Sequence, residues 1–203
     1  MSNVCAGTTD ADRIEAAGVV GAGGAGFPTH IKARGAADVV IANGVECEPV
    51  LAKDKAVMRA RPGDVAYGLA VMMGCVGASR GVIAVKRKNS REVDAMKAAA
   101  RGYADVAVAE VGDYYPAGDE HVLVYELTGR VVPAGGIPLQ AGAVVSNVET
   151  LLNVANAVRD GASVTHKYVT VAGEVKRPGT FRAPVGASLA QLIEAAGGVR
   201  ESL

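Results

Sequence analysis

Short apolar runs alternate with helical stretches along most of this chain, and this alternation restricts the possible folds more than any other feature. The runs are continuous and rich in valine and alanine, as expected for strands buried on both faces. Alternation of this kind predicts an α/β fold, a Rossmann-like, mostly parallel sheet with helices on both faces and ligands at the carboxyl ends of the strands. The expected strands are residues 39–42, 81–88, 104–113 and 142–147, and the expected helices are residues 62–77, 90–103, 118–130 and 148–161.

The pattern changes after residue 162. Residues 163–187 predict two strands around a "KRPG" turn, and Ser188 is expected to begin a helix. This β-β-α order is the opening of a β-grasp unit of the SLBB type. Only three residues follow Arg200, so we expect the sequence to stop inside that unit. The predicted domains are residues 1–162, an α/β ligand-binding domain, and residues 163–203, a truncated β-grasp domain.

Charge and hydropathy exclude several classes of partner. Lys and Arg together number 21, as do Asp and Glu, so no net positive charge favours nucleic acid or an anionic membrane surface. The apolar stretch 67–85 is interrupted by Ser79, Arg80 and Gly81, which indicates a buried helix and strand rather than a membrane span. The N-terminus has no export signal, and a cytoplasmic location is expected. We interpret the basic triplet 86–88 as the solvated end of a strand.

Cysteines and histidines give no sign of a metal site or of a catalytic thiol. They are far apart in sequence and show no ligand spacing, so we expect reduced thiols, no zinc or iron–sulfur cluster and no metal-binding residues. The carboxylates on either side of Cys47 disfavour its thiolate and argue against a nucleophile there. The residues concerned are Cys5, Cys47, Cys75, His30, His121 and His166.

A glycine-rich loop lies between two short expected helices, residues 10–17 and a helix that starts after Pro28. Five glycines occur between Gly18 and Gly26. Glycine permits positive φ and close approach of a ligand to the main chain, so this loop predicts a cradle of amides for phosphate. "GAGGAG" fits G-x-G-x-x-G, but it follows a helix rather than a strand, which argues against an ordinary dinucleotide fingerprint. The alternative is a turn that only packs helices.

Three polar stretches follow predicted strands and should meet the glycine loop at one edge of the sheet. They are "NGVECEP" (43–49), "YYPAGDE" (114–120) and "SNVET" (146–150). Converging amides and carboxylates over a glycine cradle suit an extended ligand with a phosphate and a polar ring system.

These motifs, in this order, resemble those of the flavin-binding subunits related to the 51 kDa NADH-oxidising subunit of respiratory complex I. The resemblance rests on "GAGGAGFPTHIK", "ANGVECEP", "YPAGDE" and "SNVETL" and covers about residues 10 to 200. Within that superfamily the sequence is most similar to the cobalamin reductases of propanediol utilisation and to the C subunits of Rnf complexes. The version "YPAGDE" favours the cobalamin reductases.

The resemblance implies FMN as cofactor and assigns its contacts. The glycine loop would meet the phosphate and ribityl chain, with Lys32 as the matching cation. Asn43 and Glu46 would hold the ring edge and the ribityl hydroxyls, the 115–120 stretch would close the opposite wall, and the 147–150 stretch would complete the phosphate end. The implied cofactor-binding residues are Gly21, Gly23, Gly24, Ala25, Lys32, Asn43, Glu46, Tyr115, Gly118, Asp119, Glu120, Asn147 and Thr150.

NADH is the electron donor that the resemblance implies, and the sequence departs from the family here. Phe27 would offer a stacking face, and Glu48 and Glu120 match carboxylates near the nucleotide. The complex I version has Arg in place of Ala22, an acidic residue in place of Val45, and a second Phe after the lysine. FMN is therefore better supported than NADH.

The predicted function is an FMN-binding electron-transfer module of an NADH-dependent oxidoreductase, with no catalytic side chain because the flavin supplies the chemistry. A corrinoid or corrinoid enzyme would be the acceptor in the cobalamin-reductase subfamily, which implies a bacterial microcompartment, and a ferredoxin chain in the Rnf subfamily. Iron–sulfur clusters and redox protein partners are expected only through a further C-terminal region. A different class of function remains open, a binding or scaffold module whose flavin site is vestigial because of Ala22 and Val45.

Overall fold

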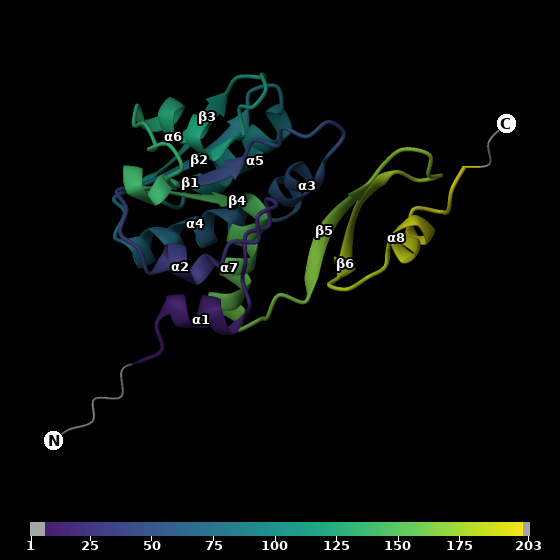
Figure 1. The fold of residues 1–203 in the computed structure, drawn as a ribbon, viewed down its shortest axis with the longest axis horizontal. Coiled ribbons are helices and arrows are strands. Elements are labelled where there is room, and N and C mark those ends of the chain that lie inside the picture. The colour runs from purple at the N-terminus through teal and green to yellow at the C-terminus, as the bar shows by residue number, and fades with distance from the viewer. Residues whose placement is uncertain (1–6, 201–203) are drawn as a thin grey trace.

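The computed structural model describes residues 7–200 and contains a four-stranded parallel sheet in the order β3-β2-β1-β4 (Figure 1). A two-stranded antiparallel sheet, β5-β6, follows it in the sequence. The strands are β1 Val39–Gly44, β2 Arg80–Lys86, β3 Val106–Val111, β4 Ala143–Asn147, β5 His166–Val171 and β6 Gly179–Pro184. The helices are α1 Asp10–Ala16, α2 Thr29–Ala33, α3 Lys53–Ala60, α4 Pro62–Val76, α5 Ser90–Ala100, α6 Glu120–Thr128, α7 Val148–Asp160 and α8 Leu189–Ala195, with a 3-10 turn at Pro138–Ala141.

Side chains of the central strand alternate between two hydrophobic cores. Val40 and Ala42 point into the larger core, with side chains of α4, α5 and α7. Val39 and Ile41 point the other way, into a smaller core that includes Leu123 of α6. The apolar runs are continuous because both faces of the sheet are covered, and Figure 1 shows α4 and α7 on one side and α6 on the other. The predicted fold class, an α/β parallel sheet with a β-grasp unit after it, is confirmed.

Helix ends lie where their capping residues predict. Asp119 caps α6 by accepting from the backbone N–H groups of His121 and Val122, Asn147 caps α7 through Glu149 N–H, and Ser188 caps α8 through Gln191 N–H. At the other end of α7, Gly161 adopts the left-handed conformation with φ of 63°, which ends the helix.

Helix α3 was not predicted from the sequence. It begins after Ala52, whose side chain gives no cap, and follows directly on the polar stretch 43–49. The signal that could have revealed it is the spacing of Asp54, Val57 and Met58, which are three and four residues apart and are all buried. The helix matters for the site because Asp54 lies on its first turn.

The β5-β6 hairpin contacts the α/β unit through hydrogen bonds from main-chain amides. Ala52 N–H donates to Thr170 Oγ1 at 3.1 Å, and Tyr168 N–H donates to Glu149 Oε1 at 2.9 Å. In the connection before β5, Val164 N–H donates to the carbonyl of Ala17 at 2.9 Å. The hairpin is thereby attached to α3 and α7, two helices that also border the candidate site.

None of the helices within residues 7–200 combines the length and the apolar character that a membrane span needs.

Candidate functional site

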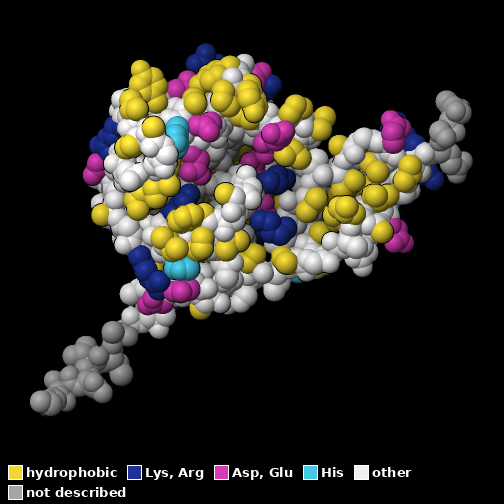
Figure 2. Space-filling view, viewed as in Figure 1, with side chains coloured by type: hydrophobic (Ala, Val, Ile, Leu, Met, Phe, Trp, Pro, Cys, Tyr) yellow, Lys and Arg dark blue, Asp and Glu magenta, His cyan; other side chains and the backbone are white. Residues whose placement is uncertain are grey.

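A cavity of about 440 Å³ opens at the carboxyl ends of β1 and β4. Asn43 and Asn147 are register partners at the ends of these two strands. From β1 the sheet continues to β2 on one side and to β4 on the other, so the cavity lies at the point where the strand order reverses, the usual ligand position in open α/β sheets. Figure 2 shows acidic side chains around a hollow on this side of the α/β unit.

The glycine-rich loop forms one wall of the cavity. It is closed at its base by a bridge between Val20 and Pro28, where Gly21 N–H donates to the carbonyl of Phe27 at 2.9 Å. Gly24 has φ of 135° and Gly26 has φ of 64°, conformations that favour glycine. Within the described residues the amides at 23–26 have no hydrogen-bond acceptor, so the loop presents free donors to the cavity.

Thr150 fixes the loop from the first turn of α7. Its Oγ1 accepts a buried hydrogen bond of 2.9 Å from Ala22 N–H, although the two residues are 128 positions apart. Thr150 was predicted as a flavin contact, and the structure also gives it a supporting role in the cradle.

The polar stretch after β1 is joined to the 115–120 stretch by hydrogen bonds around Gly118. Asn43 Nδ2 donates to the carbonyl of Gly118 at 2.9 Å, and Gly118 N–H donates to Cys47 Sγ at 2.9 Å. Asn43 Oδ1 also accepts from Val45 N–H at 3.0 Å. A Cβ on Gly118 would overlap the carbonyl oxygen of Val45, so only glycine allows this approach. The side-chain nitrogen and oxygen of Asn43 both have partners in the protein, so Asn43 holds the two stretches of this wall together.

A buried ionic network lies behind the cavity at the start of α7. Asn147 Nδ2 donates to Asp54 Oδ2 at 2.8 Å, and Lys53 Nζ is 2.8 Å from Asp54 Oδ1 and 3.2 Å from Glu149 Oε2. Asp54 is 3% exposed and Glu149 is 1% exposed. Burial alone lowers the pKa of Lys53, but the two carboxylates outweigh it and raise that pKa above its ordinary value. Through Glu149 the network reaches Tyr168 of the hairpin.

Lys32 lies at one end of the cavity, where its charge already has partners. Its Nζ donates to the carbonyl of Val145 at 2.7 Å, is 3.6 Å from Glu120 Oε1 and lies 5.6 Å from the centre of the Phe27 ring. Lys32, Phe27 and Glu120 also line an adjoining cavity of about 250 Å³ whose other walls are largely apolar, including Ile137 and Leu139. An aromatic or flat ring could bind there beside the main cavity.

The surroundings of Ser146 indicate whether a polar cofactor fits the cavity. Ser146 is 3% exposed and belongs to the lining of the main cavity, and its buried hydroxyl has no hydrogen-bond partner in the described part of the chain. A buried hydroxyl without a partner costs about 1–3 kcal/mol, so it calls for a ligand atom. Together with the free amides of the loop it fits a polar, phosphate-bearing cofactor such as FMN.

The structure brings every predicted site residue to this one cavity. Tyr115 forms part of the rim, with 76% of its surface exposed. Their roles toward a ligand remain predictions. The predicted residues among the lining are Gly21, Gly23, Gly24, Ala25, Phe27, Lys32, Asn43, Glu46, Glu48, Tyr115, Gly118, Asp119, Glu120, Asn147 and Thr150.

Asp54 and Ser146 are among the cavity residues that the sequence did not assign to the site. Ser146 belongs to the "SNVET" stretch, whereas Asp54 lies on the unpredicted helix α3. The expectation that residues 86–88 are solvated is wrong for Lys86, which is 8% exposed, because β2 is covered on both faces to its last residue.

The cysteines and histidines contribute little besides Cys47, which lines the cavity. Burial, with a smaller effect of Asp10, raises the pKa of the Cys75 thiol. His30 lies 3.5 Å from Glu15 at the surface. Cys5 lies outside the described residues. Within residues 7–200 no group of three or more His, Cys, Asp or Glu side chains could hold a metal ion.

Comparison with known families gives two matches. Residues 14–156 match the Nuo51 FMN-binding domain, and residues 168–202 match the SLBB domain. The first match contains the glycine loop, the three polar stretches and the whole parallel sheet.

Curated relatives and a solved structure agree with these matches. Cobalamin reductase PduS of Citrobacter freundii is 41% identical over 187 residues, which cover 92% of this chain and 41% of the reductase. The C subunit of the Na(+)-translocating ferredoxin:NAD(+) oxidoreductase complex of Acetobacterium woodii is 35% identical over 198 residues, 93% of this chain and 45% of that relative. An NAD+-reducing NiFe hydrogenase in the H2-reduced state superposes with a TM-score of 0.80 at 27% identity, covering 92% of this chain and 38% of that one. The chain spans less than half the length of each relative.

Proposed function

The chain belongs to the family of Nuo51 FMN-binding domains, and from this premise we propose that it is the FMN-binding electron-transfer module of an NADH-dependent cobalamin reductase. The observation that carries the proposal is the cavity at the ends of β1 and β4, whose lining includes residues 23–26, with amides that have no acceptor within the described residues, and Ser146, with a buried hydroxyl that has no partner there. We also propose that the flavin-binding domain ends at residue 162 and the β-grasp domain begins at residue 163.

The proposed cofactor position follows from the charges around the cavity. The glycine loop and the N-terminal turn of α7 supply N–H donors for a phosphate, and the positive end of the helix dipole favours the same anion. Glu46 and Glu48 line the cavity from the stretch after β1 and suit the polar edge of a ring. FMN, when bound, accepts a hydride and releases electrons one at a time. The side chains bind and orient it.

The donor nucleotide would enter from the apolar side. Phe27 and Glu120 line both the main cavity and the adjoining apolar one, so a ring seated there would lie next to the flavin cavity. Glu48 lies on another part of the rim. Ile137 and Leu139 would give the nucleotide the apolar contact that a second Phe gives in the complex I version. We propose NADH as donor on this basis.

Identity with the relatives favours cobalamin reductase over the Rnf type. The match to the reductase is 41% identical and the match to the ferredoxin:NAD(+) oxidoreductase protein is 35% identical, over similar lengths. The second candidate function is that of an Rnf-type C subunit, and the 35% sequence identity supports it. On the first proposal the acceptor is a corrinoid or corrinoid enzyme and the location is the cytoplasm, within a bacterial microcompartment. On either proposal, iron–sulfur clusters in a further C-terminal region would carry electrons to redox partners.

Anaerobic mixing tests the function. The chain is loaded with FMN, separated from free flavin and mixed with NADH, and the visible flavin absorption should bleach faster than that of free FMN at the same concentration. Adding aquacobalamin to the bleached protein should then restore the absorption faster than adding oxidised ferredoxin. Bleaching no faster than that of free FMN contradicts the NADH-dependent function and favours a scaffold module, and faster recovery with ferredoxin favours the Rnf type.

A further inference from the structure

A second cavity, of about 490 Å³, lies next to the flavin cavity at the carboxyl ends of β2 and β3. The two cavities share residues 46–48 and Tyr115 as a common wall. The second cavity shares none of its lining with the apolar cavity at Phe27 and Ile137, so it is separate from the proposed NADH position. The cavity is unused by the proposed function.

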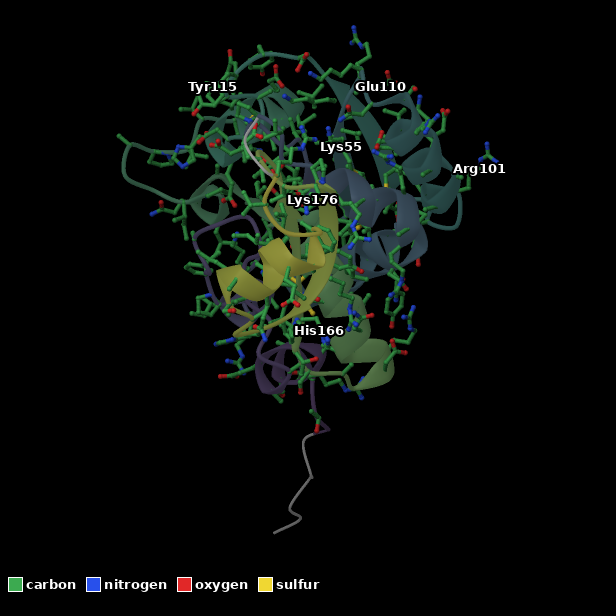
Figure 3. The ribbon with its side chains drawn as sticks, turned by 90° about the vertical axis from the view of Figure 1, so that its right-hand side faces the viewer. Lys55, Arg101, Glu110, Tyr115, His166 and Lys176 are labelled. Carbon is green, nitrogen blue, oxygen red and sulfur yellow. The ribbon has the colours of Figure 1, made fainter. Side chains whose placement is uncertain are left out.

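Three lysines line this second cavity. Lys86 has a side chain only 10% exposed, so its ammonium group lies inside the cavity rather than on an open face. Lys88 is more exposed, and Lys55 projects from α3. In Figure 3 Lys55 and Tyr115 lie on the upper half of the α/β unit, above Lys176 and His166 of the hairpin region.

The lysines outnumber their carboxylate partners. Lys86 Nζ and Lys88 Nζ share the carboxylate of Asp113, at 3.2 Å and 2.6 Å, and these bonds, that of Lys88 foremost, lower the pKa of Asp113. The ammonium group of Lys55, on helix α3, makes no hydrogen bond or ion pair within the described residues. The carboxylate of Asp113 is therefore shared by two ammonium groups, and the third ammonium group, that of Lys55, has no carboxylate partner within the described residues.

The other charged side chains of the second cavity are two carboxylates. Glu46 and Glu48 belong to the wall shared with the flavin cavity, and Glu46 Oε1 accepts from Glu48 N–H at 3.0 Å. Asn89 lies with the lysines, and its side chain makes no hydrogen bond in the described chain. The two carboxylates thus line the flavin cavity as well, whereas the three lysines line the second cavity alone.

We propose that this second cavity binds a phosphate-bearing small molecule through Lys55, Lys86 and Lys88. Ammonium groups hold phosphate as point charges, and three lysines in the lining of one cavity suit it. The volume exceeds that of a single phosphate, which leaves room for the rest of the molecule beside the shared wall. The depth of Lys86 favours a small molecule over an acidic protein surface, which could not reach it.

Calorimetric titration with inorganic pyrophosphate tests the proposal on the chain saturated with FMN, so that the glycine loop is occupied. The unmodified chain should bind one pyrophosphate, more weakly at high salt. Lys55→Gln and Lys88→Gln should each weaken binding about five-fold or more. Asp113→Asn should tighten it, because the competing carboxylate is removed. Lys97→Gln is the matched control, since Lys97 pairs with Glu110 and does not line the cavity.

Three results would overturn the proposal. They are no saturable binding, an equal loss in the Lys97→Gln control, or weaker binding in Asp113→Asn. The same titration without FMN separates this proposal from the flavin assignment, because the Lys55 and Lys88 effects should persist whether or not FMN binds.

Discussion

Thr150 on the first turn of α7 accepts a hydrogen bond from the amide of Ala22, and this contact ties the glycine-rich loop to the end of the parallel sheet. Replacing the hydroxyl with a methyl group, Thr150→Val, should lower stability by about 1 kcal/mol, because Ala22 N–H loses its acceptor. FMN affinity should fall about ten-fold, since the loop is no longer held in its cradle conformation. Chemical denaturation and flavin fluorescence titration measure the two effects.

Thr170→Val is the matched control for that change. Thr170 Oγ1 accepts from Ala52 N–H at 3.1 Å in the hairpin contact and shares a second hydrogen bond with Thr180 Oγ1 at 3.2 Å, both away from the flavin cavity. The stability of Thr170→Val should therefore fall at least as much as that of Thr150→Val, while its FMN affinity is unchanged. Equal affinity losses in both variants would show that Thr150 acts only through general stability.

Gly118 should tolerate no side chain. In Gly118→Ala the new Cβ overlaps the carbonyl of Val45, and relief requires the 115–120 stretch to move away from the stretch after β1. We expect a loss of about 2 kcal/mol in the free energy of unfolding and a lower FMN affinity. Gly74→Ala in α4 is the control, because nothing lies within 4 Å of its Cβ, and it should leave stability equal or higher. An unchanged FMN titration for Gly118→Ala would contradict the arrangement of this wall.

Ser146→Ala should separate stability from binding. The hydroxyl has no protein partner, so its removal should leave the free energy of unfolding unchanged or raise it by up to about 1 kcal/mol. FMN affinity should fall, because the cofactor loses a buried hydrogen bond. Ser188→Ala should show the opposite pattern, since it removes the cap of α8 without touching the cavity. An FMN affinity unaffected by Ser146→Ala would mean that the hydroxyl does not face the cofactor.

The ionic network behind the cavity predicts how stability depends on alkaline pH. The pKa of Lys53 is raised in the folded chain, so its stabilising effect is complete below the ordinary lysine pKa of about 10.4 and is lost as the pH rises through the folded value. Lys53→Met, which leaves Asp54 without a cation and Glu149 with only Lys167 at 3.9 Å, should lower stability by about 3 kcal/mol at neutral pH. The difference from the unmodified chain should shrink above about pH 10.4. Urea denaturation at several pH values measures it, and a constant difference would contradict the assigned pairing.

Local signals in the sequence explain how much of the fold could be predicted. Strands with both faces covered appear as continuous apolar runs, as in Val39 to Ala42 of β1, and caps such as Asp119 and Asn147 mark helix starts. Helix α3 could not be predicted from a cap because Ala52 supplies none. The 3-10 turn at Pro138–Ala141 is too short to show a helical periodicity of apolar residues.

The site residues that follow strands in recognisable motifs could be predicted from the sequence. Those whose role depends on burial in the folded chain could not. The predicted polar stretches meet because parallel strands bring their carboxyl ends to one edge. The isolation of the Ser146 hydroxyl, the pairing of Asp54 with Asn147 and the burial of Lys86 depend on residues distant in sequence. No local pattern encodes them.

Comparing FMN with riboflavin in binding titrations tests the central claim most directly. The two ligands share the ring and ribityl chain and differ only in the phosphate, which we assign to the amides of the glycine loop. The chain should bind FMN at least about 100-fold more tightly than riboflavin, and Gly23→Val should reduce this preference because its side chain would press on Asn147, at the proposed phosphate end of the cavity. Equal affinity for both ligands, or a preference for FMN that survives Gly23→Val, would contradict the assignment.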